Sequence, residues 1–282
     1  MLEYDADRFD PSMRSRFRSW RYLNSSFAPQ FRALAADPES FAEEGRFPAI
    51  WHTGTKFVLL LTAPDGSRAV YKSFRPGAPV FRKRFRFAPT TREAMNYRLV
   101  GDLGIPTPEL LAAGETRSAG RLTGAFLITR YAENFTDGRI FIPGGRLADD
   151  AEAVDAFTLE HLRLLAKMHD AGCRNKGFYP ANLLIGPPDA APRALWIDLA
   201  GCGRFTWGFR LKQTVRDLTE YFRCFHFDAE RLRKFVRAYL AARRHDPPSE
   251  ETLTAAVERA MRRRKFRHMR QACAVLTAAE KN

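Results

Sequence analysis

The sequence predicts an α+β fold with two lobes, a small antiparallel β lobe that carries one helix and a larger, mostly helical lobe after it. Short apolar runs separated by turns between residues 47 and 74 indicate the strands of the first lobe. Apolar residues at helical spacing after residue 150 indicate the second. We expect the first lobe over residues 46–131 and the second over 132–282, after a basic, aromatic extension over residues 1–45. A chain of 282 residues, 45% of them apolar, can bury cores of this size.

The composition indicates a preference for anionic partners. The formal net charge is +14, and Arg supplies most of the excess. Planar guanidinium groups suit phosphate and carboxylate groups. Nucleic acid, an anionic membrane surface and a phosphorylated glycolipid all fit this charge, and composition does not choose among them. An Arg-rich composition is equally compatible with genomic base composition alone.

Location is expected to be cytoplasmic, with peripheral contact at the inner face of the membrane as a further option. No apolar run is long enough to span a membrane, and the N-terminus lacks the apolar core of a secretory signal. Cysteines at 173, 202, 224 and 273 have neither paired nor metal-site spacing and indicate reduced thiols. Residues 12–35 interleave Arg with aromatic residues, so they could lie in a headgroup layer or pack on the domain. Pro29 interrupts the helical pattern, which favours packing.

The first lobe contains a candidate phosphate-binding lysine. A strand over residues 56–61 is followed by a turn and a strand that ends at Lys72. A lone Lys in an apolar strand after two hairpins is typical of the small lobe of a kinase, where it contacts nucleotide phosphates beneath a glycine turn, here around Gly54. An ordinary strand lysine is the alternative. The helix predicted over residues 91–103 supports the first interpretation, because Glu93 could pair with Lys72.

Two further segments of this lobe have candidate roles. Residues 76–91 place basic side chains among phenylalanines, which indicates either an anchor for an anionic acceptor or a solvated loop. The basic residues are Arg82, Lys83, Arg84 and Arg86. Residues 126–131 form an apolar strand, consistent with a hinge that binds adenine, and residues 132–150 are predicted to be a linker.

The stretch 164–201 carries the strongest motif. A helix end, a polar loop and two short apolar runs lead to Asp198, the layout of a kinase catalytic centre in which Asn182 and Asp198 hold magnesium. The stretch resembles the lipopolysaccharide kinase family, the kinases of heptose and Kdo sugars. The matching residues are Met168, His169, Gly172, Tyr179, Asn182, Leu183 and Leu184. The resemblance implies a protein-kinase-like two-lobed fold that binds ATP and Mg²⁺ in an interlobe cleft.

One departure from the family pattern concerns the catalytic base. Gly177 occupies the position of the catalytic Asp, five residues before Asn182, and Asn175 occupies that of the expected His. The simplest hypothesis is a pseudokinase-like protein that binds ATP but transfers phosphate poorly, with a protein partner possible. The alternative is an active kinase of a lipopolysaccharide core sugar or related hydroxylated acceptor, in which Asp170 substitutes as base or the acceptor is already ionised. A basic nucleic-acid-binding protein is the third reading, although no recognition motif supports it.

The chain after Asp198 is basic, and Arg204 and Arg210 are candidates for contacting a phosphorylated sugar or anionic glycolipid acceptor. The resemblance implies that Asp217 braces the catalytic loop through backbone hydrogen bonds, and a carboxylate near a helix N-terminus is the alternative. His169 is expected to be a core or helix-end histidine rather than a catalyst. Helices are predicted over 215–242 and 251–276, the second with a basic face that is either phosphate-binding or solvated.

Overall fold

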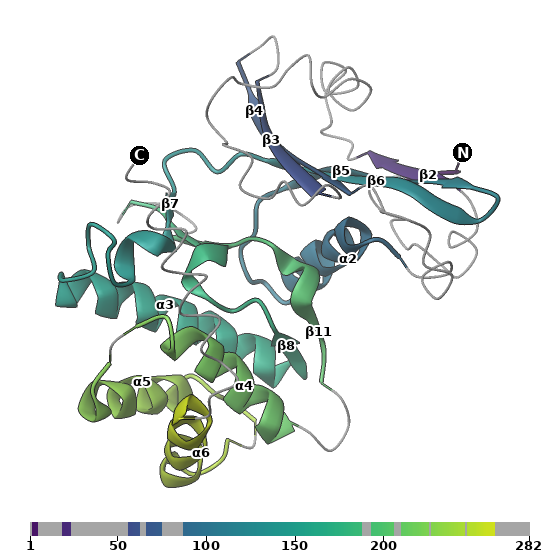
Figure 1. Ribbon diagram of the computed structural model, residues 1–282. Coiled ribbons are helices and arrows are strands. Elements are labelled where there is room, and N and C mark those ends of the chain that lie inside the picture. Colours follow the sequence, from purple (N-terminus) through teal and green to yellow (C-terminus); the bar gives the residue numbers. More distant parts are fainter. Residues whose placement is uncertain are drawn as a thin grey trace. The chain divides into compact units, whose positions relative to one another are not determined.

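A mixed β-sheet forms the core of the first of two compact units, residues 1–99 and 108–133. The protein is described here from a computed structural model, in which the described residues are 2–4, 19–23, 56–62, 66–74, 87–187, 193–205, 210–225, 227–245 and 247–262. Within these residues the sheet has six strands in the order β1-β2-β5-β6-β4-β3, all antiparallel except the β1–β2 pair (Figure 1). The strands are β1 (Leu2–Tyr4), β2 (Trp20–Leu23), β3 (Lys56–Thr62), β4 (Arg68–Phe74), β5 (Leu110–Ser118) and β6 (Arg121–Arg130).

Residues with positive φ lie next to strands β4, β5 and β6 of this sheet. Gly66, at φ +80°, precedes β4, whose residues then alternate between half-buried and buried positions. Ala119 and Gly120, at φ +47° and +74°, form the two-residue turn between β5 and β6. Positive φ at both central residues is the type I′ geometry that matches the twist of a hairpin. The hairpin brings β5 back against β6, which in turn pairs with β4.

Part of the predicted N-terminal extension belongs to the sheet. Strand β2 pairs with β5, from Trp20 opposite Glu115 to Leu23 opposite Ala112. The side chain of Tyr22 is buried. For residues 19–23 the structure therefore supports packing on the domain over a position in a headgroup layer.

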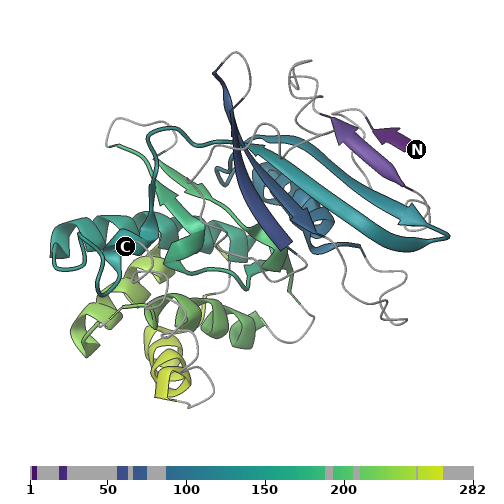
Figure 2. The same cartoon turned by 45° about the horizontal axis from the view of Figure 1, so that its top comes forward.

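One helix, α2 (Pro89–Asp102), lies on a face of this sheet (Figure 2). Its residues up to Leu99 cluster with the first unit, and residues 100–107 cluster with the second. The helix is predicted within two residues of its observed ends. Its buried apolar residues are Ala94, Tyr97 and Val100, at the spacing of one helical side.

Helices dominate the second unit, which comprises residues 100–107 and 134–282. Asp150 and Asp228 cap the N-termini of α3 and α5, because their carboxylates accept the backbone N–H groups of Ala153 and Arg231. The helices are α3 (Ala151–Asp170), α4 (Arg210–Phe222), α5 (Ala229–Ala241) and α6 (Glu250–Arg262). The largest fully buried side chains of this unit are Trp196, Tyr221, Tyr239, Phe157, Phe178, Phe222 and Phe235.

Two small sheets complete the second unit. Within the described residues one has three strands in the order β10-β9-β7, and the other pairs β11 with β8. The short elements are β7 (Thr136–Asp137), β8 (Cys173–Asn175), β9 (Leu183–Ile185), β10 (Ala194–Trp196) and β11 (Cys202–Arg204), with the 3-10 turns η5 (Gly138–Phe141), η6 (Pro180–Asn182) and η7 (Leu199–Gly201).

Two sequence expectations change, and a third is tested only in part. Residues 132–150 are not a linker throughout, because β7 pairs with β9 and η5 follows it directly. The helical stretch predicted over 215–242 is two helices, since α4 ends at Phe222 and Asp228 caps a new one. The prediction over 251–276 holds to Arg262, and the rest of it lies outside the described residues.

None of the helices that the structure describes has the length and apolar character needed to cross a membrane. Three of the cysteines, Cys173, Cys202 and Cys224, are free thiols as predicted, and Cys273 lies outside the described residues.

Candidate functional site

In the first unit, Lys72 and Glu93 form the ion pair that the sequence predicts. Lys72 Nζ lies 2.7 Å from Glu93 Oε1. The Glu93 side chain is 4% exposed and that of Lys72 23% exposed, so the ammonium keeps access to solvent or a ligand. Lys72 sits in the interior of the sheet, between Val58 on β3 and Leu127 on β6, which fixes its backbone. The pair thus presents a positioned cation on a rigid strand.

In the second unit, a β-hairpin places Asn182 beside Asp198. Strands β9 and β10 pair with Leu183 opposite Trp196, and the Ile197 amide donates to the Asn182 carbonyl oxygen at 2.9 Å. The end of one strand and the start of the other therefore lie side by side. Asp198 adopts a left-handed backbone, φ 52° and ψ 57°, which is uncommon for a residue other than glycine and is enriched at functional sites.

The loop between β8 and η6 is shaped by its own polar groups. Asn175 is buried, and its side-chain oxygen accepts the Gly177 amide at 2.9 Å. The Gly177 carbonyl accepts the Tyr179 amide at 2.9 Å and the Asn182 Nδ2 at 3.0 Å. Asn175, Gly177, Asn182 and Asp198 are thus brought together, as the sequence predicts for the loop as a whole.

No base stands at position 177, and the three described atoms nearest to a Cβ at this position do not supply one. A Cβ built on Gly177 would lie 3.0 Å from Asn182 Nδ2, 3.4 Å from Asn175 Oδ1 and 3.5 Å from the Asp198 carbonyl oxygen. These three nearest groups are amides and a backbone carbonyl, so none of them can take a proton from a hydroxyl at neutral pH.

The donor set at Asn182 and Asp198 fits magnesium. Both residues offer hard oxygen ligands, which Mg²⁺ prefers. Because Asn182 Nδ2 donates to Gly177, the amide is oriented with Oδ1 as its remaining ligand atom. Among the described residues, no group of three or more His, Cys, Asp or Glu side chains could hold a metal. A cation here would take its other ligands from water and phosphate oxygens, the usual manner of Mg²⁺.

Asp217 braces the loop through a hydrogen bond with its backbone, as the family resemblance implies. Its Oδ2 accepts the Asn175 amide at 2.7 Å and lies 3.2 Å from His169 Nε2. His169 Nδ1 lies 2.7 Å from the Tyr239 hydroxyl, which accepts a bond from Arg243 Nη1 at 2.8 Å. A neutral His169 satisfies every contact if Nε2–H donates to Asp217 and the Tyr239 hydroxyl donates to Nδ1.

Burial agrees with a neutral His169, since it lowers the pKa of this imidazole. Burial also raises the pKa of the Tyr239 hydroxyl to about 12, so this group stays protonated and can donate. His169 is therefore a core histidine that holds Asp217, which confirms the sequence interpretation.

The structure argues against Asp170 as a substitute base. Its carboxylate accepts Arg243 Nε at 2.6 Å, the Arg244 amide at 2.8 Å and the His245 amide at 3.2 Å. These contacts tie the end of α3 to the segment after α5. The Arg243 guanidinium and the two amides hold the pKa of Asp170 below its usual value against the opposing effect of burial. A base that is both occupied and weakened is a poor proton acceptor.

Basic side chains flank the loop, because Arg174 and Lys176 are the sequence neighbours of Asn175 and Gly177. Lys176, beside Gly177, is exposed. The neighbouring Arg174 lowers the pKa of the Lys176 ammonium, and burial and Arg216 add to this effect. Glu220 accepts Arg216 Nε at 2.8 Å, and burial raises the pKa of its carboxyl group. The flank is electropositive and favours anions.

The structure describes only some of the remaining candidate residues. Arg204 and Arg210 are exposed, at the end of β11 and the start of α4. Gly54, Arg82, Lys83, Arg84 and Arg86 lie outside the described residues. The two candidate polar groups belong to different compact units, Lys72 and Glu93 to the first, Asn182 and Asp198 to the second.

Two residues that support the second group were missed in the sequence. His161 on α3 accepts the Trp196 Nε1–H at 3.1 Å, two residues before Asp198, and both side chains are buried. Burial lowers the pKa of His161 to about 3. Gly138 packs so closely that a Cβ there would lie 2.5 Å from both Phe157 Cζ and the Pro180 oxygen. The only signal for Gly138 in the sequence was the presence of a glycine in an apparent linker.

Known proteins resemble the chain in sequence family and in fold. The model of the lipopolysaccharide kinase (Kdo/WaaP) family matches residues 79–239. The solved structure of WaaP in complex with acyl carrier protein is similar at 18% identity and a TM-score of 0.58, over 86% of this chain and 97% of that chain. This likeness confirms the kinase-like α+β fold that the sequence predicts.

Two structures of the Rio2 kinase from Chaetomium thermophilum also align. The first, a complex with ADP/Mg²⁺ and phosphoaspartate, has a TM-score of 0.42 at 15% identity and covers 89% of this chain and 75% of that chain. The second has a TM-score of 0.43 at 17% identity and covers 90% and 77%. No curated protein matches the chain in sequence.

Proposed function

Because this chain belongs to the lipopolysaccharide kinase (Kdo/WaaP) family, we propose that it binds ATP with Mg²⁺ and transfers phosphate poorly, as a pseudokinase-like member. One observation carries the proposal. The loop around Gly177 keeps the hydrogen bonds that orient Asn182 beside Asp198, yet offers no proton acceptor at position 177.

Each polar residue has a role in this proposal. The Lys72 ammonium, held by Glu93, binds the phosphates. Asn182 and Asp198 hold the magnesium ion, which neutralises charge on the phosphate oxygens when bound. His169 and Asp217 keep the loop in shape through the Asn175 amide. The two groups lie in different units, and we propose that one nucleotide engages both.

Loss of the base predicts a reduced rate rather than loss of binding. General-base catalysis typically contributes about 10²–10⁴-fold in rate. Phosphoryl transfer depends mainly on positioning and charge neutralisation, which the remaining residues can supply. Nucleotide affinity is therefore expected to survive where turnover does not.

An active kinase is the second candidate, favoured by the electropositive flank of the loop. Its acceptor would be a lipopolysaccharide core sugar or a related hydroxylated, anionic glycolipid. The exposed Arg204 and Arg210 and the cations at Arg174 and Lys176 are suited to a phosphorylated acceptor. An acceptor embedded in a membrane would bring the protein to its cytoplasmic surface.

A protein partner is a further part of the proposal. The similar WaaP structure holds acyl carrier protein. A net charge of +14 favours an acidic protein partner through electrostatic steering. Nucleic-acid binding has no observation in its favour beyond the same net charge.

Thermal melting with ATP tests the nucleotide proposal. With ATP at about 100 times its Kd, linkage predicts a stabilisation of about 2.7 kcal/mol. For a chain of this size that corresponds to a Tm rise of roughly 5–10 °C. We expect the wild type to show this rise with Mg²⁺, and Lys72→Ala and Asp198→Ala to lose most of it.

Lys234→Ala is the matched control, because this lysine pairs with Asp155 at an exposed position of α5. It should respond to ATP like the wild type. A wild type that shows no shift with ATP and Mg²⁺ would remove the nucleotide proposal.

A further inference from the structure

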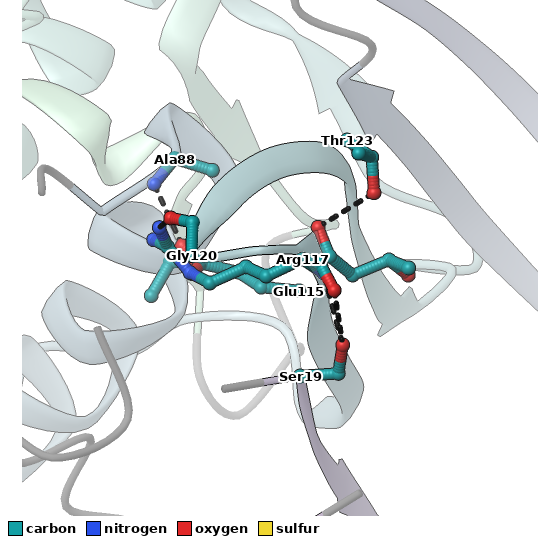
Figure 3. Close-up of polar contacts among 8 residues, drawn as sticks. Ser19, Ala88, Glu115, Arg117, Gly120 and Thr123 are labelled. Carbon is teal, nitrogen blue, oxygen red and sulfur yellow. Dashed lines mark hydrogen bonds and ion pairs between the residues drawn. The ribbon is translucent and has the colours of Figure 1, made fainter. Parts of the chain in front are cut away.

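The first unit contains an ion pair that is buried completely. Arg117 Nη2 lies 2.6 Å from Glu115 Oε2, Arg117 Nε donates to the same oxygen at 3.0 Å, and both side chains have 0% exposure (Figure 3). Removing two charges from water is costly, and apolar residues of similar volume often stabilise a fold equally well. Stability alone therefore does not account for a pair at this place.

The second carboxylate oxygen of Glu115 holds the start of helix α2. Glu115 Oε1 accepts the Ala88 amide at 2.7 Å and the Thr91 hydroxyl at 2.6 Å. The first turn of α2 has no acidic residue of its own. Helix N-termini need acceptors for their free N–H groups and favour a negative charge. Strand β5 thus supplies the cap that the helix sequence lacks.

Arg117 connects this carboxylate to the β5–β6 hairpin and to the residue that precedes β2. Its Nη1 donates to the Gly120 carbonyl, in the β5–β6 turn, at 3.2 Å. Its backbone amide donates to Ser19 Oγ at 2.9 Å, just before β2 (Figure 3). Glu115 therefore has contacts on both sides, with Arg117 of the sheet and with the start of helix α2.

The sheet register connects this cap to the candidate phosphate-binding pair. Lys72 on β4 lies opposite Leu127 on β6, which lies opposite Ala113 on β5. Cross-strand partners point to the same face, and Glu115, two residues beyond Ala113, shares that face. Helix α2 covers this face and contacts the sheet at two points. Thr91 donates a hydrogen bond to Glu115, and Glu93, two residues later, pairs with Lys72.

We propose that Glu115 and Arg117 are positioning residues that set the start of α2 and so keep Glu93 on Lys72. This role rests on the proposed function, because the Lys72 ammonium that Glu93 holds is the group proposed to bind a nucleotide. Glu115 itself contacts no phosphate. It acts through Thr91 and Ala88, and a displaced helix start moves Glu93.

Chemical labelling of Lys72 tests the link without nucleotide. A lysine paired with a carboxylate is held protonated and reacts slowly with an amine acylating reagent. We expect Glu115→Gln to raise the acylation rate of Lys72 several-fold, toward that of Glu93→Gln, as quantified by peptide mass spectrometry. The amide keeps the volume of Glu115 but turns an N–H donor toward either Arg117 or the helix start.

Two further variants separate positioning from stability. Thr91→Val removes one bond of the cap, leaves the ion pair intact, and should raise the labelling of Lys72 by a smaller factor. Glu109→Gln breaks a half-exposed pair, 2.7 Å long, between the residue that precedes β5 and Arg130 at the end of β6, and should leave Lys72 unchanged. Unchanged Lys72 labelling in folded Glu115→Gln would overturn the proposal, as would an equal rise in Glu109→Gln.

A separate experiment measures the affinity for ATP. If ATP binds as proposed, Glu115→Gln should weaken its affinity in the wild type but cause little further loss in the Lys72→Ala background, because both changes act through one pair. Equal losses in the two backgrounds would contradict the positioning role. A wild type that binds no ATP would refute the proposed function alone, since the labelling result stands without nucleotide.

Discussion

A single residue, Gly177, separates the proposed nucleotide binding of this protein from its proposed loss of catalysis. The residues around Gly177 still make the contacts that orient Asn182, so the loop retains its shape without the carboxylate. Asn175 takes part in this by accepting the Gly177 amide. Restoring the carboxylate is therefore a direct test of what its absence costs.

We predict that Gly177→Asp raises ATP turnover above that of Gly177→Ala by about 10²–10⁴-fold, the usual contribution of a general base. The alanine variant is the reference because any Cβ at this position lies 3.0 Å from Asn182 Nδ2, which must give by a few tenths of an ångström. The measurement is steady-state turnover with a phosphorylated core oligosaccharide. Equal rates for the two variants, or a wild type that already turns over at tens per second, would mean that the base is not the limiting part.

Residue-level prediction from sequence succeeded where local periodicity determines the contact. Strand alternation places Lys72 and helix phase places Glu93, and their pairing follows. Asp170 shows the limit, because its partners Arg243 and His245 come from a segment far along the chain. Glu115 and Arg117, two residues apart in one strand, had the spacing of a same-face pair, but nothing local showed that both would be buried.

At the scale of elements, residues 136–141, which belong to the second unit, support the loop and are not a linker. Strand β7 pairs with β9, Asp137 opposite Leu184, and η5 begins immediately after it. Gly and Asp in residues 132–150 suggested a linker, yet Asp137 and Asp150 are helix-capping residues. Caps and loops use the same residue types, which is why composition could not separate them.

Gly138 allows η5 to reach the loop, so Gly138→Ala should destabilise this contact. The added methyl group would lie 2.5 Å from Phe157 Cζ and the Pro180 oxygen and 3.0 Å from the Leu183 oxygen. Overpacking of this kind costs about 1–3 kcal/mol. Chemical denaturation measures the loss, with Gly203→Ala as control because a Cβ there meets nothing within 4 Å. Equal stability of the two variants would show that η5 can shift without cost.

At the scale of the whole molecule, sequence periodicity was sufficient to predict the lobes and most of the helices. The β9–β10 hairpin was also predictable, since two short apolar runs flank a Pro-rich turn before Asp198. The buried polar contacts were not, because His161 with Trp196 and His169 with Asp217 join residues that only the folded chain brings together. These contacts make the stability of the protein depend on pH.

His161 should make the protein less stable in acid. Its folded pKa of about 3 lies below the unfolded value of 6.5, so between these values the unfolded chain binds a proton that the folded chain does not. The stability due to neutral His161 is complete above pH 6.5 and is lost as the pH falls. Linkage gives a loss of about 2 kcal/mol between pH 7.5 and pH 5.

His161→Gln isolates this contribution. The glutamine oxygen can still accept the Trp196 Nε1–H, while the titrating group is gone and His169 titrates equally in both proteins. We expect the free energy of unfolding of the wild type, measured by denaturant titration, to fall by about 2 kcal/mol more than that of the variant over this pH range. Parallel pH profiles would show that His161 can be protonated within the fold, and that the contact holding the strand before Asp198 is looser than its burial implies.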